Sequence, residues 1–98
     1  MKLQMYSIHF DADQSLLDFI QTKLNKLDTF YDRIIDGEVF LRLDNNNVNN
    51  KLVEVKIFVP GSTLFTKTES SSFENATDEA LATLTRQIKK YKEKSVAH

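Results

Sequence analysis

Hydrophobic and polar residues alternate in four segments of the chain, the pattern of β-strands that bury one face. In the first segment, residues 2–10, the alternation holds through Met5 and resumes out of phase at Ile8, which predicts a bulge or an early bend near Tyr6-Ser7. The other three segments predict strands over residues 34–43, 51–59 and 63–69.

Two other segments repeat their apolar residues every three or four positions, as amphipathic helices do. The first predicted helix runs from about residue 14 to about residue 28, after Asp11-Ala12-Asp13, where either aspartate can cap the first turn. The second runs from Phe73 to about Lys94, after Ser70-Ser71-Ser72, which offers a similar cap. The apolar stripes comprise Leu16, Leu17, Ile20, Leu24 and Leu27 in the first helix, and Ala76, Thr77, Ala80, Leu81, Leu84, Ile88 and Tyr91 in the second.

The order of these elements is β-α-β-β-β-α, which predicts an α+β fold. A helix between the first two strands requires a crossover and therefore a parallel pair. Short connections at Asp44–Asn50, which contains five asparagines, and at Pro60-Gly61 allow the last three strands to form an antiparallel meander. We therefore expect a four-stranded mixed sheet with two roughly parallel helices packed on one face, in a single domain over residues 1–98.

The face of the sheet opposite the helices stays uncovered in this arrangement. If the predicted strand phases hold, Phe40, Phe58 and Phe65 lie on that face, with lysine and arginine side chains between them. We favour packing of these rings across neighbouring strands. The alternative is a surface for weak self-association or for binding another protein.

The 98 residues have the composition of an ordinary globular protein, with no cysteine and a net charge of -1. The lack of cysteine excludes disulfides, thiolate nucleophiles and thiolate zinc sites. The amino-terminal segment does not follow the pattern of a signal peptide, and no apolar run is long enough to cross a bilayer. We therefore expect a cytoplasmic protein without a membrane partner.

The sequence offers no pattern typical of a catalytic or metal site. The two histidines, His9 and His98, have no evident nucleophile partner and no metal-binding spacing. Two glycines are too few for a glycine-rich phosphate loop, and Asp11 with Asp13 is better explained by helix capping than by a calcium loop. We expect no enzyme activity, metal, cofactor or small-molecule substrate, and the alternative is a carboxylate site assembled only by the fold.

The last predicted helix has a very uneven charge. Its first turns carry acids, whereas residues 86–94 carry five basic residues against one acid. Acids at the start and bases at the end of a helix complement its dipole, and each such charge stabilises the helix by about 0.3–1 kcal/mol. Taken alone, this order of charges favours an ordinary solvated surface. Because five bases exceed what the dipole requires, the alternative is contact with nucleic-acid phosphates. Helical spacing places Arg86, Lys89, Lys90 and Lys94 opposite the apolar stripe, where they form one ridge.

Three further cations could share a surface with this ridge. Lys23 and Lys26 lie along one edge of the first apolar stripe, so two helices packed side by side would bring their cations into one groove. Arg33 could join from the following loop, unless it pairs with Asp28 or Asp32.

Two segments resemble the family of short ribosome hibernation-promoting factors. One covers residues 22–34, TKLNKLDTFYDRI, and the other covers residues 84–94, LTRQIKKYKEK, in which an Arg-Gln pair precedes alternating lysines. The order of the elements and the length agree with the family as well. The start of the last helix departs from it, because Glu74 stands where the family often has a tyrosine.

The resemblance implies a translation inhibitor that keeps idle ribosomes in a stored state under stress. Such a protein binds the small ribosomal subunit and its ribosomal RNA in the channel used by messenger and transfer RNA. The resemblance is to the short form, without the second domain through which long members pair ribosomes. RNA of this kind is recognised mostly by shape and backbone, which suits lysine and arginine. Carried over to matching positions, the RNA-facing residues are Lys23, Lys26, Arg33, Arg86, Lys89, Lys90, Lys92 and Lys94.

Overall fold

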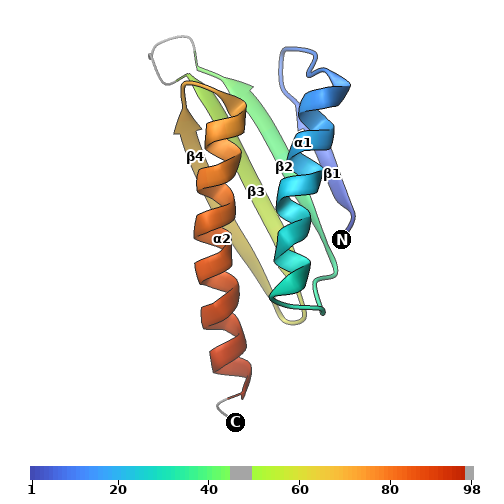
Figure 1. Cartoon of the computed structure of the whole chain (residues 1–98), viewed down its shortest axis with the longest axis vertical. Helices are drawn as coiled ribbons and strands as arrows, with labels where there is room; N and C mark the ends of the chain where they lie inside the picture. The colour runs from blue at the N-terminus through green and yellow to red at the C-terminus, as the bar shows by residue number, and fades with distance from the viewer. Residues whose placement is uncertain (45–49, 97–98) are drawn as a thin grey trace.

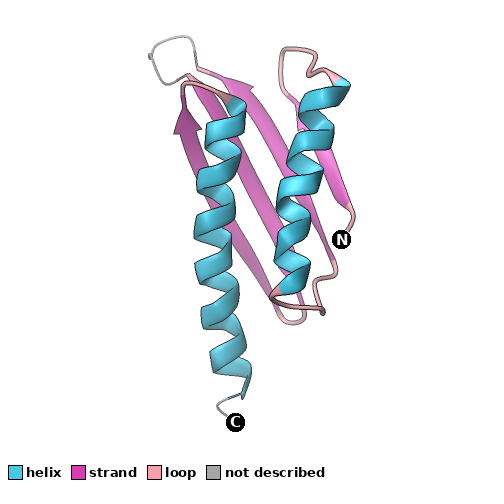
Figure 2. Ribbon diagram, in the orientation of Figure 1, coloured by secondary structure: helices cyan, strands magenta, loops and turns pink. Residues whose placement is uncertain are grey.

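A computed structural model, which describes residues 1–44 and 50–96, contains a four-stranded sheet with helices on one face (Figure 1, Figure 2). The elements are β1 (Leu3–Ser7), α1 (Gln14–Leu24), the 3-10 helix η1 (Asn25–Thr29), β2 (Asp36–Leu43), β3 (Lys51–Val59), β4 (Ser62–Ser70) and α2 (Phe73–Val96). The strand order is β1-β2-β3-β4, with β1 parallel to β2 and the other neighbours antiparallel. The predicted α+β fold and its mixed sheet are therefore confirmed.

The two hairpins of the sheet follow the predicted turns. β2 and β3 pair antiparallel along the whole of β2, and the amide of Asp44 donates to the carbonyl of Asn50 at 2.8 Å. The predicted Asn-rich connection is therefore confirmed at its flanks, whereas residues 45–49 lie outside the described residues. Between β3 and β4, Gly61 adopts φ 78°, a left-handed conformation that favours glycine, so the predicted turn is confirmed.

β1 is shorter than the alternation predicted, because the chain leaves the sheet after Ser7. The amide of Ile8 still donates to the carbonyl of Leu41 at 2.9 Å, and His9 then takes a left-handed backbone with φ 64°. The change of phase therefore marks the predicted bend, which turns the chain toward the start of α1. β2 also begins later than predicted, at Asp36.

α1 begins at a predicted cap but ends earlier than its apolar stripe. The Asp13 carboxylate accepts a hydrogen bond from the amide of Leu16 at 2.9 Å, so Asp13 and not Asp11 caps the helix. The predicted α-helix to residue 28 is wrong beyond Leu24, where the chain tightens into η1. The shorter hydrogen-bond step of a 3-10 turn satisfies carbonyls that an ending α-helix leaves free. The stripe continues through η1, because Leu27 is fully buried.

The core lies between the sheet and the helices, which start near the same end of the sheet and run in the same direction (Figure 1). The predicted parallel pair of helices on one face is therefore confirmed. Phe10 and Phe73 stack with ring centres 5.3 Å apart, which joins the starts of the two helices. The fully buried side chains include Ile20, Leu24 and Leu27 from α1 and η1, Val39, Leu41, Val53, Val55 and Ile57 from the sheet, and Leu84 and Ile88 from α2.

α2 is fastened to the β4 side of the sheet by hydrogen bonds from its side chains to backbone carbonyls. The amide of Gln87 donates to the carbonyl of Phe65 in β4 at 2.9 Å. The hydroxyl of Tyr91 donates to the carbonyl of Pro60 in the turn between β3 and β4. The last turns of α2 extend past the end of the sheet (Figure 1), and Lys92 and Lys94 near the end of this helix are exposed.

Candidate nucleic-acid interface

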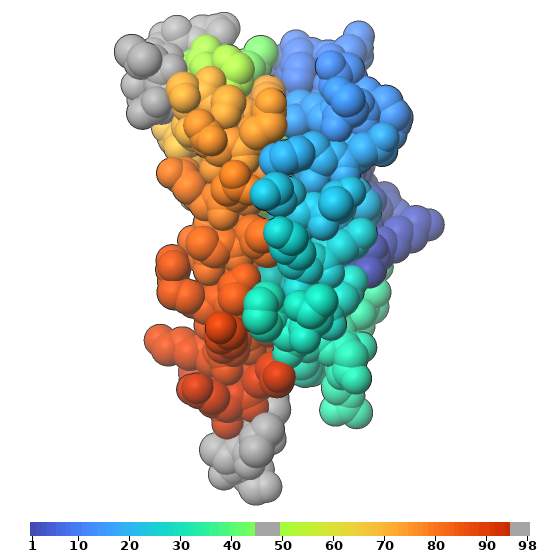
Figure 3. All heavy atoms as spheres, viewed as in Figure 1, coloured from blue at the N-terminus to red at the C-terminus, as the bar shows by residue number. Residues whose placement is uncertain are grey.

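α1 and α2 meet along a seam on the outer side of the molecule (Figure 3). Lys23 of α1 reaches across this seam, and its Nζ lies 3.2 Å from Oδ1 of Asp78 in α2. The Lys23 side chain is only 31% exposed, and its ammonium lies 5.4 Å from the centre of the Phe19 ring. Lys23 therefore joins the two helices, and its charge is less available to an external phosphate than its sequence position indicated.

Further along the seam, Phe30 contacts two lysines of α2. Phe30 directly follows η1, and its ring centre lies 5.1 Å from Nζ of Lys89. Its carbonyl accepts a hydrogen bond from Nζ of Lys92 at 2.7 Å. Both lysines are exposed, so each keeps a side that a ligand can reach. No local sequence pattern predicts this contact, because 62 positions separate Phe30 from Lys92.

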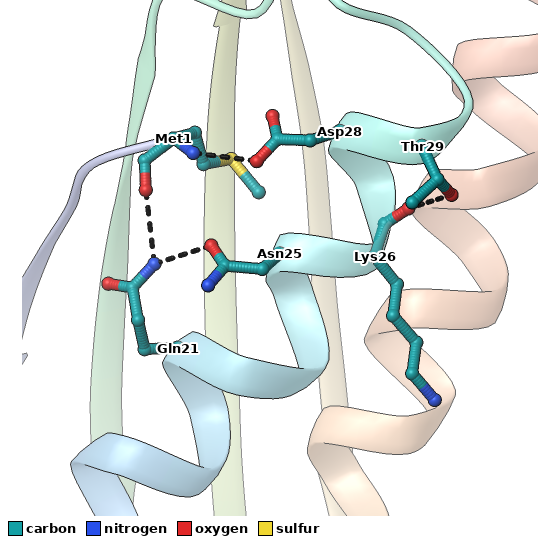
Figure 4. A network of polar contacts seen from close by, with 6 residues as sticks. All are labelled: Met1, Gln21, Asn25, Lys26, Asp28 and Thr29. Atoms are coloured by element: carbon teal, nitrogen blue, oxygen red, sulfur yellow. Dashed lines mark hydrogen bonds and ion pairs between the residues drawn. The ribbon is translucent and has the colours of Figure 1, made fainter.

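Lys26 belongs to the same end of the seam. It is exposed, and Figure 4 shows its side chain on the side of the segment that faces α2. The contacts on the other side of the segment join the amino-terminal ammonium of Met1 to Asp28 at 2.6 Å (Figure 4). Lys26 therefore points away from these contacts and toward the helix that carries Lys89 and Lys92.

The remaining cations of α2 line two neighbouring hollows, one on α2 itself and one between α2 and β4. All of them are exposed, and Glu93 is the acid that accompanies them. The predicted ridge is therefore contiguous, and Lys89 connects it to the seam because its ammonium also lies over Phe30. The cations are Arg86, Lys89 and Lys90 in the first hollow, and Lys90 and Lys94 in the second.

Arg33 lies in the loop after η1, and it is exposed. Within the described part of the chain it forms no ion pair with Asp28 or Asp32, and Asp28 binds the Met1 ammonium instead. The pairing considered as an alternative is therefore wrong. No described contact joins Arg33 to the cations of α2, so it remains a separate candidate.

Two tyrosines connect this loop to α2. The rings of Tyr31 and Tyr91 stand edge to face with centres 5.6 Å apart, and both are half-buried. Partial burial raises the pKa of the Tyr31 phenol above its ordinary value of 10.0, and the Tyr91 hydroxyl adds to this rise. The positive charge of Arg33 opposes the rise in pKa. The Tyr31 phenol is therefore neutral at pH 7, and the two packed rings hold the loop against α2.

The starts of the helices carry the opposite charge to their ends. Asp11, Asp13 and Glu74 line a hollow beside Phe10 and Phe19 at this end of the helix layer. The layer is therefore acidic where the helices begin and basic where they end, which complements both helix dipoles. The net charge of -1 therefore coexists with local excesses of either sign in the helix layer.

The open face of the sheet carries the predicted phenylalanines, whose positions alternate with those of the core. Phe40 stacks on Tyr6 with ring centres 5.0 Å apart, and Nζ of Lys56 lies 5.7 Å from the centre of the Phe40 ring. Phe58 is half-buried, whereas Phe65 in β4 is 46% exposed. Packing across strands, the favoured explanation, therefore accounts for Phe40. It does not account for Phe65, whose ring stays exposed.

The part of the chain that the structure describes offers little chemistry other than charge. Among residues 1–44 and 50–96, no three histidine, aspartate or glutamate side chains are grouped so that they could hold a metal ion. None of the described helices combines the length and the apolar character that crossing a membrane requires. His9 lies in the bend after β1, and His98 lies outside the described residues.

The structure brings most of the predicted cations together and sets two of them apart. Lys23 is engaged by Asp78, and Arg33 stands alone in its loop. Asp78 and Phe30 were not among the predicted residues, since their roles depend on contacts between distant segments. The cations gathered at the basic end of the helix layer are Lys26, Arg86, Lys89, Lys90, Lys92 and Lys94.

Comparison with protein families gives one match that spans almost the whole chain. The profile described as sigma 54 modulation protein / S30EA ribosomal protein matches residues 3–96. The chain is 27% identical over 94 residues to the ribosome hibernation promoting factor of Pseudomonas putida, covering 96% of this chain and 89% of that protein. It is 28% identical over 95 residues to the ribosome hibernation promotion factor of Deinococcus radiodurans, covering 92% of this chain but only 50% of that protein. The chain therefore spans about half the length of the Deinococcus relative.

Two solved structures share the fold along nearly their whole length. A ribosomal subunit interface protein from Coxiella burnetii superposes with a TM-score of 0.84 at 26% identity, covering 95% of this chain and 99% of that one. The amino-terminal domain of Protein Y from Thermus thermophilus superposes with a TM-score of 0.83, covering 93% of this chain and 99% of that one. At 22% identity the second likeness concerns the fold alone.

Proposed function

We propose that this chain is a ribosome hibernation factor, because it belongs to the family of sigma 54 modulation protein / S30EA ribosomal proteins. In this role it is a cytoplasmic protein that binds the ribosome and inhibits translation under stress. Its relatives in Pseudomonas putida and Deinococcus radiodurans carry the name of that function. The proposed activity is binding and not catalysis.

The observation that carries the proposal is the gathering of exposed cations at one end of the helix layer. The chain as a whole has a net charge of -1, so a general attraction to RNA is not expected from its composition. Contiguous lysines along α2, with Lys26 beside them, provide a local surface that RNA phosphates can neutralise. All of these cations are exposed, so the surface is accessible to a ligand.

The finer proposal concerns where on the ribosome the protein binds. We infer that it binds ribosomal RNA of the small subunit, in the channel used by messenger and transfer RNA. The family resemblance supports this position, and the name of the Coxiella burnetii protein places that relative at the subunit interface. The proposed RNA-binding residues are Lys26, Arg86, Lys89, Lys90, Lys92 and Lys94, with Lys23 and Arg33 contributing less.

A charge reversal tests this surface directly. The triple variant Lys89→Glu, Lys90→Glu and Lys92→Glu should lose co-sedimentation with small subunits and with whole ribosomes at low salt. All three side chains are exposed, so the fold should survive, which circular dichroism can verify. In the wild type, binding should weaken steeply as salt rises, because each phosphate contact releases a counterion. Undiminished binding by the triple variant would exclude the proposed surface.

A matched pair of neutral variants shows whether RNA affinity depends on where positive charge is removed or only on the net charge of the protein. Replacing Lys89, Lys90 and Lys92 by glutamine removes three charges from the proposed surface. Replacing Lys2, Lys56 and Lys67 by glutamine removes the same number from the amino-terminus and the open sheet face. The first variant should reduce the slope of log affinity against log salt by about 0.7–0.9 per lost phosphate contact, and the second should leave the slope unchanged.

The exposed ring of Phe65 supports a second, weaker candidate, self-association through the open sheet face. This candidate predicts a sedimentation coefficient that rises with protein concentration and that Phe58→Ser reduces. Ribosome binding should not depend on that substitution if the helix side is the RNA-binding side. The two candidates are therefore separable with one variant and two measurements.

A further inference from the structure

Phe30 contacts two cations of the proposed RNA-binding surface at once. Its ring lies under the ammonium of Lys89 at 5.1 Å, and its carbonyl accepts a hydrogen bond from Lys92 at 2.7 Å. The two lysines project from the same helix, three positions apart, and both converge on this one residue of a different segment. This convergence fixes the direction of two long side chains that would otherwise be free in solvent.

Phe30 is itself held firmly in place. Its amide donates to the carbonyl of Leu27 at 3.1 Å, and the amide of Tyr31 donates to the same carbonyl at 3.2 Å. Leu27 is fully buried, and the half-buried Phe30 ring packs against the core. Phe30 is therefore a rigid support that belongs to the fold, and Lys89 and Lys92 rest on it.

The contact with Phe30 does not neutralise the charges of the two lysines. A ring face and a neutral carbonyl leave the positive charge in place, unlike the carboxylate that pairs with Lys23 across the same seam. An ammonium has three donors, so Lys92 retains donors after it has bound the Phe30 carbonyl. Lys89 and Lys92 are therefore oriented and remain available to phosphates.

We infer that Phe30 is a positioning residue, which orients Lys89 and Lys92 toward the phosphates of a bound RNA backbone. The inference rests on the proposed function. A lysine that is already ordered loses less side-chain freedom when it binds, so affinity gains without any additional contact to the ligand. Phe30 thereby links the end of the first helical segment to the cations of α2, although it carries no charge of its own.

The test uses Phe30→Leu, which keeps the carbonyl and the apolar bulk but removes the aromatic ring. Its dissociation constant for ribosomes and for poly(U) RNA should rise by about two- to ten-fold, the size expected when one lysine side chain is ordered on binding instead of beforehand. Phe30→Tyr should restore affinity to within about two-fold of the wild type, because a tyrosine ring also attracts a cation. The dependence on salt should keep the wild-type slope, since the same phosphates are neutralised.

Phe40→Leu is the matched control. It removes a ring of the same kind from beneath Lys56 on the opposite face of the sheet, with a comparable loss of packing. Its affinity for RNA should equal that of the wild type, and its midpoint of thermal unfolding should fall as that of Phe30→Leu does. If both variants lost affinity equally, a general loss of stability would explain the effect and the inference would be overturned.

A double-mutant cycle identifies the lysine through which Phe30 acts. If the ring works through Lys89, adding Phe30→Leu to Lys89→Met should lower affinity no further than Lys89→Met alone. Additive losses, or a Phe30→Leu variant that binds as tightly as the wild type, would overturn the inference. Wild-type binding to poly(U) but not to ribosomes would refute the proposed function, and the cycle on poly(U) would still decide the role of Phe30. A wild type that bound neither RNA would overturn both.

Discussion

Lys23 and Lys89 show how the same side chain acquires different roles from its neighbours. Each ammonium lies over a phenylalanine ring, at 5.4 Å for Lys23 and 5.1 Å for Lys89. Lys23 also faces the carboxylate of Asp78 at 3.2 Å, whereas Lys89 forms no ion pair with the rest of the described chain. An ion pair within the fold competes with external phosphates. Lys23 therefore contributes to the helix contact, and Lys89 is left to a ligand.

Gly37 in β2 gives a prediction at the scale of a single residue. A Cβ at this position would lie 2.8 Å from both Cδ2 of Leu3 and the backbone carbonyl of Lys56, and the backbone cannot yield as a side chain can. Gly37→Ala should therefore lower the free energy of unfolding by about 1–3 kcal/mol, the usual cost of overpacking. Urea denaturation measures this change.

Gly61 is the control, because its constraint is different. A Cβ there would meet no atom within 4 Å, but the backbone has φ +78°. Gly61→Ala should cost about 1 kcal/mol through backbone strain alone, and Gly61→Asn should cost less, since asparagine tolerates this conformation. A Gly37→Ala protein as stable as the wild type would show that Leu3 and the β3 backbone can move aside.

At the scale of elements, the two helical segments end in different ways. α1 stops at Leu24 and continues as η1, which bends the chain back toward the sheet and presents Phe30 to α2. α2 continues past the sheet, anchored at Gln87 and Tyr91 by bonds to β4 and to the turn before it. The shorter element therefore supplies a support, and the longer one supplies the cations that rest on it.

The start of α1 depends on a single cap, which gives the second prediction. Asp13→Ala removes the acceptor of the Leu16 amide and should lower the free energy of unfolding by about 1 kcal/mol. Asp13→Asn should recover most of this loss, because an amide oxygen also caps a helix. Asp11→Ala is the matched control, since Asp11 is exposed and forms no hydrogen bond within the described part of the chain. An equal loss from both alanine variants in urea denaturation would contradict the assignment of the cap.

At the scale of the molecule, whose body measures 46 × 24 × 19 Å, the charges of the helix layer are separated between its two ends. Acidic side chains lie where both helices begin, and basic side chains lie where both end. Parallel helices make this possible, because their dipoles point the same way and favour the same order of charges in each. The pair of Lys23 and Asp78 lies on the seam between the two helices, between these ends.

Asp78→Asn tests the role of this pair. The substitution removes the acidic partner of Lys23 and should raise affinity for ribosomes roughly three-fold, with a salt slope steeper by up to about 0.9 if Lys23 gains a phosphate. Stability should fall by less than about 1 kcal/mol, since the pair is partly exposed. The measurements are salt titrations of binding and urea denaturation.

Glu79→Gln is the control for Asp78→Asn. It removes the same charge from an exposed position of α2, where no ion pair with a described residue exists. Its affinity should change less than that of Asp78→Asn. Equal gains in the two variants would assign the effect to net charge and not to the release of Lys23.

The elements could be predicted from the sequence wherever the apolar period is regular. The pattern over β3 and the start of α2 agrees with the structure to the residue, because their side chains alternate or repeat against one continuous core. The ends of β1 and α1 were predicted too long, because the apolar pattern continues while the backbone changes from strand to bend or from α to 3-10 geometry. Burial governs the pattern, but backbone hydrogen bonds govern the boundary.

Local period and local charge in the sequence encode the α+β order, the core stripes and the excess of cations near the end of the last helix. Which cations are engaged and which are free depends on contacts between distant segments of the described chain. Asp78 meets Lys23, and Phe30 meets Lys89 and Lys92, across segments that no local pattern relates. The energy of a charge depends on the atoms a few ångströms away, and packing the two helices side by side is what chooses those atoms.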